Sequence, residues 1–330
     1  MTDLPTVRQL EYMVAVDEHR HFGRAAEALN VSQPGLSAQV RELERRLGVV
    51  LFERGRSTTR PTPAGRDLLD RARRIIRDVS DLSVAATLHA GDLRGVLRVA
   101  AIPTIAPYLL PAIAQLVHRQ WPHAELELEE LRTTALVDAI ERGDADLGLL
   151  ATPVETRTLH VEDLVFERFH LAVAIDHEFA DDQPISVSAI GTFQLVLLEE
   201  GHCLRDHALA ACHTIANIEH REVRKVGLSV LAQMVATGNS ATLLPEFALP
   251  AEARPGSGIA TRPFREPTVG RTLSLAWRPT DPRATLFGEA AAAIRRELES
   301  RQAKLPSLRL HPERPEPLAP VFARLAPRHR

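Results

Sequence analysis

The chain has 330 residues, two cysteines and a formal net charge of −3, with 45% hydrophobic and 25% charged residues. These values are typical of a soluble globular protein of about two domains, and they exclude a fibrous repeat, a disulfide scaffold and a four-thiolate zinc site. Because no run reaches the roughly 18–20 apolar residues of a membrane span and the N-terminus lacks the apolar core of a secretory signal, we expect a cytoplasmic protein without membrane contact.

The N-terminal segment predicts a helix-turn-helix. One helix is predicted over 23–29, and a second begins after Ser32, a good N-cap, and ends at Gly48. A polar stretch after Arg54 fits a small β-wing. Residues 1–80 carry a net charge of +3 and residues 81–300 carry −11. This segregation favours a polyanion-binding module joined to an acidic body, although ordinary fluctuation in composition would also produce it.

The second helix of such a unit enters the major groove of double-stranded DNA with its N-terminal side chains facing the bases. Glutamine pairs with adenine, serine bonds bases or phosphates, and arginine holds phosphates. The candidate DNA-contacting residues are Arg24, Ser32, Gln33, Pro34, Ser37, Gln39, Arg41 and Arg54. Many all-helical cores share this outline, so the pattern alone leaves a purely structural role open.

A long helix is predicted from Pro63, capped by Thr62, to Gly91-Asp92, and its apolar seam favours pairing with a second copy. From Gly95 onward strand and helix patterns alternate, which predicts an α/β body with largely parallel sheets and, given about 200 residues, two lobes with a cleft. The predicted strands are 96–102, 124–131, 146–151, 169–175, 194–199, 241–244, 258–264 and 271–278, and the predicted helices are 106–119, 134–142, 203–212, 228–237 and 283–303.

The predicted divisions follow from these elements. They are a winged helix-turn-helix over 1–62, a linker helix over 63–92, the two-lobed body over 93–304 and a basic, proline-rich, disordered tail over 305–330.

The two cysteines, Cys203 and Cys212, lie nine residues apart in a segment of high helix propensity. Nine helical residues separate the two ends by roughly 13 Å and place them on opposite faces, whereas a disulfide needs Cα atoms about 5.5 Å apart. The pair can therefore bridge only if the helix is rebuilt. Cys203 lies at the predicted helix start near His202 and Arg205, which we expect to favour its thiolate. Two inert, buried cysteines remain the alternative.

The segment HFGRAAEALNVSQPGLSAQVRELERRLGVVLFER (21–54), followed by TPAG (62–65), resembles the DNA-binding domain of LysR-type transcriptional regulators. The resemblance covers about residues 1–303 and implies the fold class already outlined, a winged helix-turn-helix with a two-lobed, periplasmic-binding-protein-like α/β effector domain. It also implies a homodimer or homotetramer joined through the linker helix, promoter DNA as ligand and RNA polymerase as partner.

Gly201-His202-Cys203-Leu204-Arg205-Asp206 followed by Cys212, together with AIPTIAPYLLP (101–111), resembles the hydrogen-peroxide-responsive OxyR subfamily of these regulators. By this resemblance Cys203 is the peroxidatic cysteine and Cys212 is its resolving disulfide partner. The positions that match the peroxide pocket are Thr104, Thr133, His202 and Arg271, with Thr134 an immediate competitor of Thr133. Oxidation would proceed from thiolate to sulfenic acid to a reversible disulfide.

These features predict a regulator of the oxidative-stress response, acting as an activator or repressor, that senses hydrogen peroxide without a cofactor or metal and is not an enzyme. The first alternative is a LysR-type regulator that binds a small metabolite between its lobes and has inert cysteines. The second is a thiol peroxidase-type enzyme, which leaves residues 1–90 unexplained.

Overall fold

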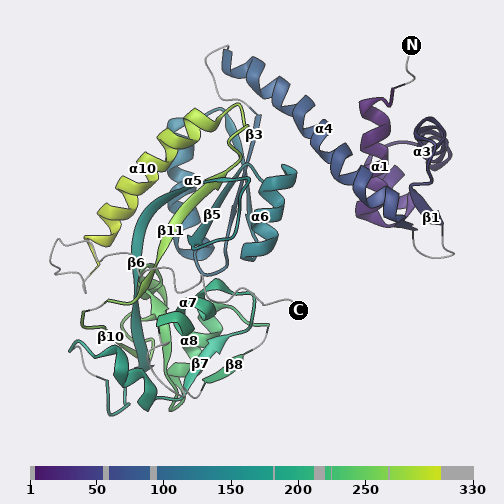
Figure 1. Ribbon diagram of the computed structural model, residues 1–330. Coiled ribbons are helices and arrows are strands. Elements are labelled where there is room, and N and C mark those ends of the chain that lie inside the picture. The colour runs from purple at the N-terminus through teal and green to yellow at the C-terminus, as the bar shows by residue number, and fades with distance from the viewer. Residues whose placement is uncertain are drawn as a thin grey trace. The chain divides into compact units, whose positions relative to one another are not determined.

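The computed structural model describes residues 4–305, apart from 55–58, 90–94, 181–182, 212–219, 224 and 267. The chain forms two compact units that divide near residue 95 (Figure 1). Among the described residues no helix is both long enough and apolar enough to cross a membrane. The tail predicted to be disordered, 305–330, lies outside the described part apart from Leu305, and so does the predicted helix end at Gly91-Asp92.

The N-terminal unit is a winged helix-turn-helix followed by a long helix. Its elements are α1 (Val7–His19), α2 (Phe22–Ala28), α3 (Gln33–Leu47), the antiparallel strands β1 (Phe52–Arg54) and β2 (Thr59–Pro61), and α4 (Pro63–His89). Local chemistry sets the helix ends as predicted. The Ser32 hydroxyl accepts a hydrogen bond from the Gly35 N–H at 3.3 Å, and the Thr62 hydroxyl accepts one from the Gly65 N–H at 2.9 Å. Gly48 ends α3 in the left-handed conformation.

The helices of this unit enclose one apolar core. Met13, Leu36, Leu43 and Leu69, contributed by α1, α3 and α4, are at most 2% exposed and belong to the same cluster. Further along α4 the apolar residues are not covered by the chain itself, because Ile75, Val79 and Leu82 are 47%, 42% and 71% exposed. Their spacing of four and three residues puts them on one face of the helix.

The second unit contains a seven-stranded mixed sheet. The strands along the sheet are β10 (Ile259–Pro263), β6 (His160–Ala174), β11 (Gly270–Trp277), β5 (Leu147–Thr152), β3 (Gly95–Ala101) and β4 (Ala124–Glu130), with β9 (Thr242–Pro245) pairing with β6. A separate parallel pair joins β7 (Leu195–Leu198) to β8 (His220–Val223). The helices are α5 (Ala106–Gln120), α6 (Thr133–Arg142), α7 (Cys203–Ala211), α8 (Leu228–Ala236), α9 (Leu249–Glu252) and α10 (Ala284–Gln302), with short 3₁₀ turns at Val187–Thr192 and Glu246–Ala248.

The expectation of largely parallel sheets is wrong. Only β3–β4, β3–β5 and β7–β8 pair in parallel within this described unit, whereas β6 pairs antiparallel with β9, β10 and β11, and β5 with β11. The physical reason is that β6 and β11 run antiparallel to each other beside the parallel strands of the first lobe, a pairing between distant segments that strand–helix alternation does not reveal.

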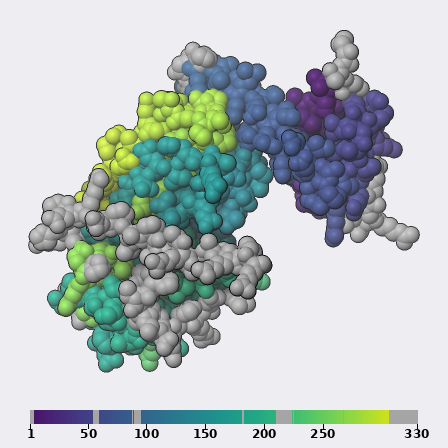
Figure 2. Space-filling model, in the orientation of Figure 1, coloured from purple at the N-terminus to yellow at the C-terminus, as the bar shows by residue number. Residues whose placement is uncertain are grey.

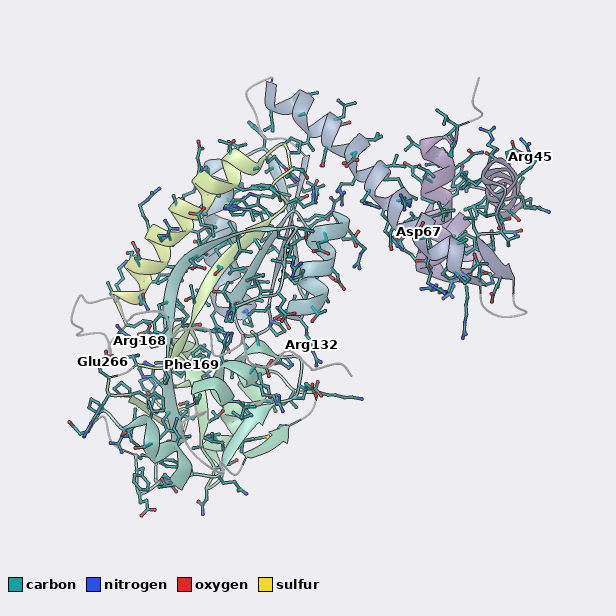
Figure 3. All side chains as sticks on the ribbon, viewed as in Figure 1. Arg45, Asp67, Arg132, Arg168, Phe169 and Glu266 are labelled. Carbon is teal, nitrogen blue, oxygen red and sulfur yellow. The ribbon has the colours of Figure 1, made fainter. Side chains whose placement is uncertain are left out.

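The two-lobed arrangement is confirmed, and β6 belongs to both lobes. It exchanges partners between Arg168, which pairs with Gly270 of β11, and Phe169, which pairs with Pro245 of β9 (Figure 3). The first lobe holds β3, β4, β5, α5 and α6, and α10 packs along β6 and α5. Figure 2 shows α10, in yellow-green, on the surface beside the teal part of this lobe. The second lobe holds β7 to β10 with α7 and α8 around a core that includes Leu195 and Leu231.

Candidate functional site

A small pocket lies where the loops after β3, β4 and β7 meet. Ile102, Pro103 and Thr104 follow β3, Arg132 and Thr133 follow β4, and Gly201, His202 and Cys203 follow β7 in the other lobe. The carboxyl ends of parallel strands are the usual place for ligand sites in α/β folds. The pocket holds about 160 Å³ of empty space, including the open solvent at its mouth. It therefore brings together Cys203 and three of the residues predicted with it, namely Thr104, Thr133 and His202.

Arg271 is the fourth predicted pocket residue, and it is fully buried behind the residues that line the pocket. Its Nε atom donates to the Glu167 carboxylate at 2.7 Å, and its Nη1 and Nη2 atoms donate to the Thr104 hydroxyl at 2.6 Å and the Thr104 carbonyl at 3.1 Å. Glu167 is 1% exposed and accepts a further bond from the Phe247 N–H at 3.0 Å. This buried pair fixes the guanidinium and, through it, the floor of the pocket.

Burial of Cys203 raises the pKa of its thiol above the usual value. The positive charge of Arg271 and the hydroxyl of Thr133 act in the opposite direction and favour the thiolate. The buried Thr133 Oγ1 atom makes no hydrogen bond of normal geometry with the described residues, so it has bonding capacity left for a ligand.

The prediction that His202 and Arg205 favour the Cys203 thiolate gains no support from the surroundings of these two residues. Burial and the charge of Arg132 lower the pKa of His202, which keeps its ring neutral, and Arg205 instead pairs with Asp206 at 3.2 Å. Helix position and sequence neighbours predicted a lowered thiol pKa, but burial raises it. The cation that favours the thiolate is Arg271, which is distant in the sequence and close to the thiol in the structure.

Two residues of this region were not predicted. Glu167 has no local signal, because its partner Arg271 is 104 residues away and only the register of β6 against β11 brings them together. His207 is one helical turn after Cys203, on the same face of α7, so helical spacing could have found it. It is 8% exposed, and its Nε2 atom is 3.1 Å from the Thr152 carbonyl oxygen. Burial, then the charge of Arg271, lower the pKa of His207 to about 4.

Acid is expected to destabilise the second unit through buried neutral histidines. The pKa values of His207 and His170 are both lowered by burial to about 4 from an ordinary value of 6.5. Between these values the unfolded state binds more protons than the native state, so the free energy of unfolding falls as the pH drops from about 6.5 to 4. Each histidine contributes up to ~3 kcal/mol to this loss.

Denaturant unfolding between pH 4 and pH 7 measures the effect. His207→Gln and His170→Gln are each expected to flatten the pH dependence, while His118→Gln, at an exposed position of α5, leaves it unchanged. An undiminished pH dependence in both buried variants would contradict this assignment.

The predicted DNA-contacting residues lie mostly on the surface of the N-terminal unit. Arg24, Ser32, Gln33, Pro34, Gln39 and Arg41 are exposed. Gln39 also accepts a hydrogen bond from the Gln9 side chain at 3.1 Å, and the Arg41 Nε atom donates to the Ser37 carbonyl at 3.2 Å. Ser37 differs from the expectation, because it is only 6% exposed and packs inside the unit in this conformation.

Two predicted site residues are not fully covered by the structure. Arg54 ends β1, but its side chain lies outside the described part, and Cys212 lies outside the described residues altogether. The pairing of Cys203 with Cys212 therefore stays a prediction. No group of three or more His, Cys, Asp or Glu residues within the described ranges is arranged to hold a metal ion.

Known families match nearly the whole described chain. Residues 7–66 match the family described as "Bacterial regulatory helix-turn-helix protein, lysR family", and residues 90–299 match the "LysR substrate binding domain".

Curated relatives of similar length also match. The chain is 38% identical over 299 residues to a "Hydrogen peroxide-inducible genes activator" of Dickeya chrysanthemi, covering 91% of this chain and 98% of that protein. It is 38% identical over 293 residues to the "DNA-binding transcriptional dual regulator OxyR" of Escherichia coli K12, covering 89% and 96%.

Solved structures show the same likeness. Full-length OxyR from Pseudomonas aeruginosa, with a cysteine substituted, matches at a TM-score of 0.74 and 35% identity, covering 88% of this chain and 94% of that one. A hydrogen-peroxide-bound cysteine mutant of Corynebacterium glutamicum OxyR matches at a TM-score of 0.61 and 34% identity, covering 91% and 96%.

Proposed function

The chain belongs to the LysR family of bacterial helix-turn-helix transcriptional regulators, and from that premise we propose that it senses hydrogen peroxide through Cys203 and converts the oxidation into altered contacts with promoter DNA. Membership in this family makes it a DNA-binding regulator and not an enzyme. The peroxide signal is supported by the similarity to OxyR proteins and, in this chain, by the surroundings of its own Cys203.

The observation that carries the proposal is the position of Cys203 in a small pocket between Thr104, Thr133 and the charge of Arg271. The Cys203 thiolate attacks one oxygen of hydrogen peroxide, the O–O bond breaks, and a sulfenic acid and water form after proton transfer. The Thr133 hydroxyl favours the thiolate form of Cys203 that makes this attack. The Arg271 charge stabilises negative charge on the departing oxygen.

The second step links the oxidation of Cys203 to a local change of structure. The sulfenic acid at Cys203 condenses with the Cys212 thiol, forming the S–S bond and releasing water. In the structure α7 runs without interruption from Cys203 to Ala211, which holds the start of this segment far from its end. Because a disulfide needs Cα atoms about 5.5 Å apart, the bridge requires α7 to unwind.

The exposed residues of α2 and α3 supply the DNA surface, with Gln33, Gln39 and Arg41 facing the bases and Arg24 holding phosphates. The exposed apolar face of α4, made of Ile75, Val79 and Leu82, pairs with a second copy, so that a dimer or tetramer reads a two-part operator. The oxidised assembly then recruits RNA polymerase.

A metabolite-sensing function is less well supported. The pocket beside Cys203 is small, and Thr104 and Thr133 stand next to the thiol in its lining. The relatives from Dickeya chrysanthemi and Escherichia coli that match over most of the chain are a hydrogen peroxide-inducible activator and OxyR, and neither is named for a metabolite.

A footprint of the purified protein on its own promoter region, reduced and then treated with peroxide, tests the proposal. We expect protection in both states, with a change in the length or spacing of the protected sequence after oxidation and reversal by dithiothreitol. The same footprint before and after oxidation would contradict peroxide sensing, and a changed footprint on adding a metabolite to the reduced protein would favour the alternative.

A further inference from the structure

An ion pair crosses the lobe boundary beside the pocket. The Arg132 guanidinium, between β4 and α6 of the first lobe, pairs with the Glu199 carboxylate, directly after β7 of the second lobe. The Lys225 backbone N–H also bonds Glu199, so the carboxylate is held from two sides. The Arg132 side chain is 46% exposed and that of Glu199 is 17% exposed, which places the pair at the rim and not in the interior.

Arg132 is at the same time one of the residues that line the pocket. Figure 3 labels it near the place where the two lobes meet. Its side chain lies over Gly201, because a Cβ atom added to Gly201 would be 3.5 Å from Nη1 and 3.8 Å from Cδ of Arg132. Gly201 has a φ of +92°, a conformation that other residues rarely adopt. The loop before Cys203 is thus shaped to lie closely under the arginine.

We propose that Arg132, held in place by Glu199, is a selectivity gate that admits hydrogen peroxide to Cys203 and excludes organic hydroperoxides with bulky substituents. This inference rests on the proposed reaction of Cys203 with peroxides and adds a residue that decides which peroxides react. Arg132 acts as a wall of the pocket and takes no part in bond making.

The chemistry of an organic hydroperoxide shows why a rim residue selects. The Cys203 thiolate attacks the terminal oxygen, the O–O bond breaks, and the alkoxide takes a proton and leaves as an alcohol while the sulfenic acid forms. The buried side of the pocket is closed by Thr104 and Arg271, at 2% exposure each. The substituent must therefore point toward the rim, where Arg132 lies, whereas hydrogen peroxide has no substituent to accommodate.

Rates of thiol oxidation with hydrogen peroxide and with tert-butyl hydroperoxide test the gate. In Arg132→Ala we expect the ratio of the tert-butyl rate to the hydrogen peroxide rate to rise by roughly tenfold, the size of effect that a change in pocket shape produces. Glu199→Gln, which removes the anchor and keeps the arginine, is expected to raise the ratio by a smaller factor. Arg132→Lys keeps a long cationic side chain and is expected to stay close to the wild-type ratio.

The matched control is Arg98→Ala, which removes an exposed ion pair with Glu127 at 3.2 Å, on β3 and β4 and away from the pocket lining. Its ratio is expected to equal that of the wild type. Folded Arg132→Ala and Glu199→Gln proteins with the wild-type ratio would overturn the gate while leaving peroxide sensing intact. A wild-type Cys203 that reacts with neither peroxide would instead overturn the proposed function.

Discussion

Replacing Arg271 with methionine is expected to lower the free energy of unfolding of the second unit by roughly 3–5 kcal/mol. The reason is the partner that the substitution leaves behind. Glu167 is 1% exposed, and the Arg271 Nε atom 2.7 Å from its carboxylate is its buried cation. Methionine fills much of the arginine volume. The fall in the free energy of unfolding therefore comes from the buried Glu167 charge left without a partner and not from a cavity.

A double variant separates this cause from a general packing defect. Glu167→Gln combined with Arg271→Met removes both charges and keeps a side-chain oxygen to accept from the Phe247 N–H, so we expect it to be more stable than Arg271→Met alone. Arg98→Met, at the exposed pair with Glu127, is expected to change stability by no more than about 1 kcal/mol. Denaturant unfolding of all four proteins measures these differences. Equal losses in the single and double Arg271 variants would contradict the buried-charge explanation.

The sequence predicts best where the determining interactions are local. Ser32 and Thr62 begin their helices by bonding an N–H three residues away, and Gly48 ends α3 through its own backbone conformation, so each boundary could be read from a few neighbouring residues. Strand and helix alternation predicted most elements of the second unit within a few residues. It missed β8 and the N-terminal part of β6, because these stretches do not show the apolar run by which the other strands were predicted.

Long-range pairing is the part that could not be predicted. Nothing near Glu167 indicates that β11 will place Arg271 opposite it, and nothing near Ser37 indicates that its side chain will be covered. The resemblance to a known family supplied Thr104, Thr133 and Arg271 as pocket residues, because local patterns do not connect segments so far apart. Arg132 and Glu199 became visible only once the two lobes were in place.

The pKa of the Cys203 thiol also depends on parts of the chain that are distant in the sequence. Its place at the start of α7 beside His202 predicted a thiolate, and this prediction used only neighbours in the sequence. Burial depends on the whole unit, and it raises the pKa of the thiol while it lowers that of His202. The groups that favour the thiolate, Arg271 and Thr133, come from other elements.

Replacing Cys203 with serine is expected to abolish the response to peroxide, with the rate of oxidation falling by at least about a thousandfold. A serine hydroxyl has nearly the same size as the thiol but is not ionised near neutral pH and is a much weaker nucleophile toward an O–O bond. Because Thr104, Thr133 and Arg271 remain in place, the variant should fold and bind DNA as the reduced wild type does. Stopped-flow oxidation and the promoter footprint measure the two properties separately.

Cys212→Ser is the discriminating partner of this experiment, because the two cysteines have different roles in the proposed sequence of steps. It should still consume one equivalent of peroxide and form a sulfenic acid at Cys203, detectable with a dimedone-type reagent, but form no disulfide and keep the reduced footprint.

If Cys203→Ser responded to peroxide as the wild type does, the sensor assignment would be wrong. If Cys212→Ser acquired the oxidised footprint without a disulfide, the sulfenic acid alone would be the signal. Unwinding of α7 would then not be required, because only a disulfide between the two ends of that helix needs the ends to come together.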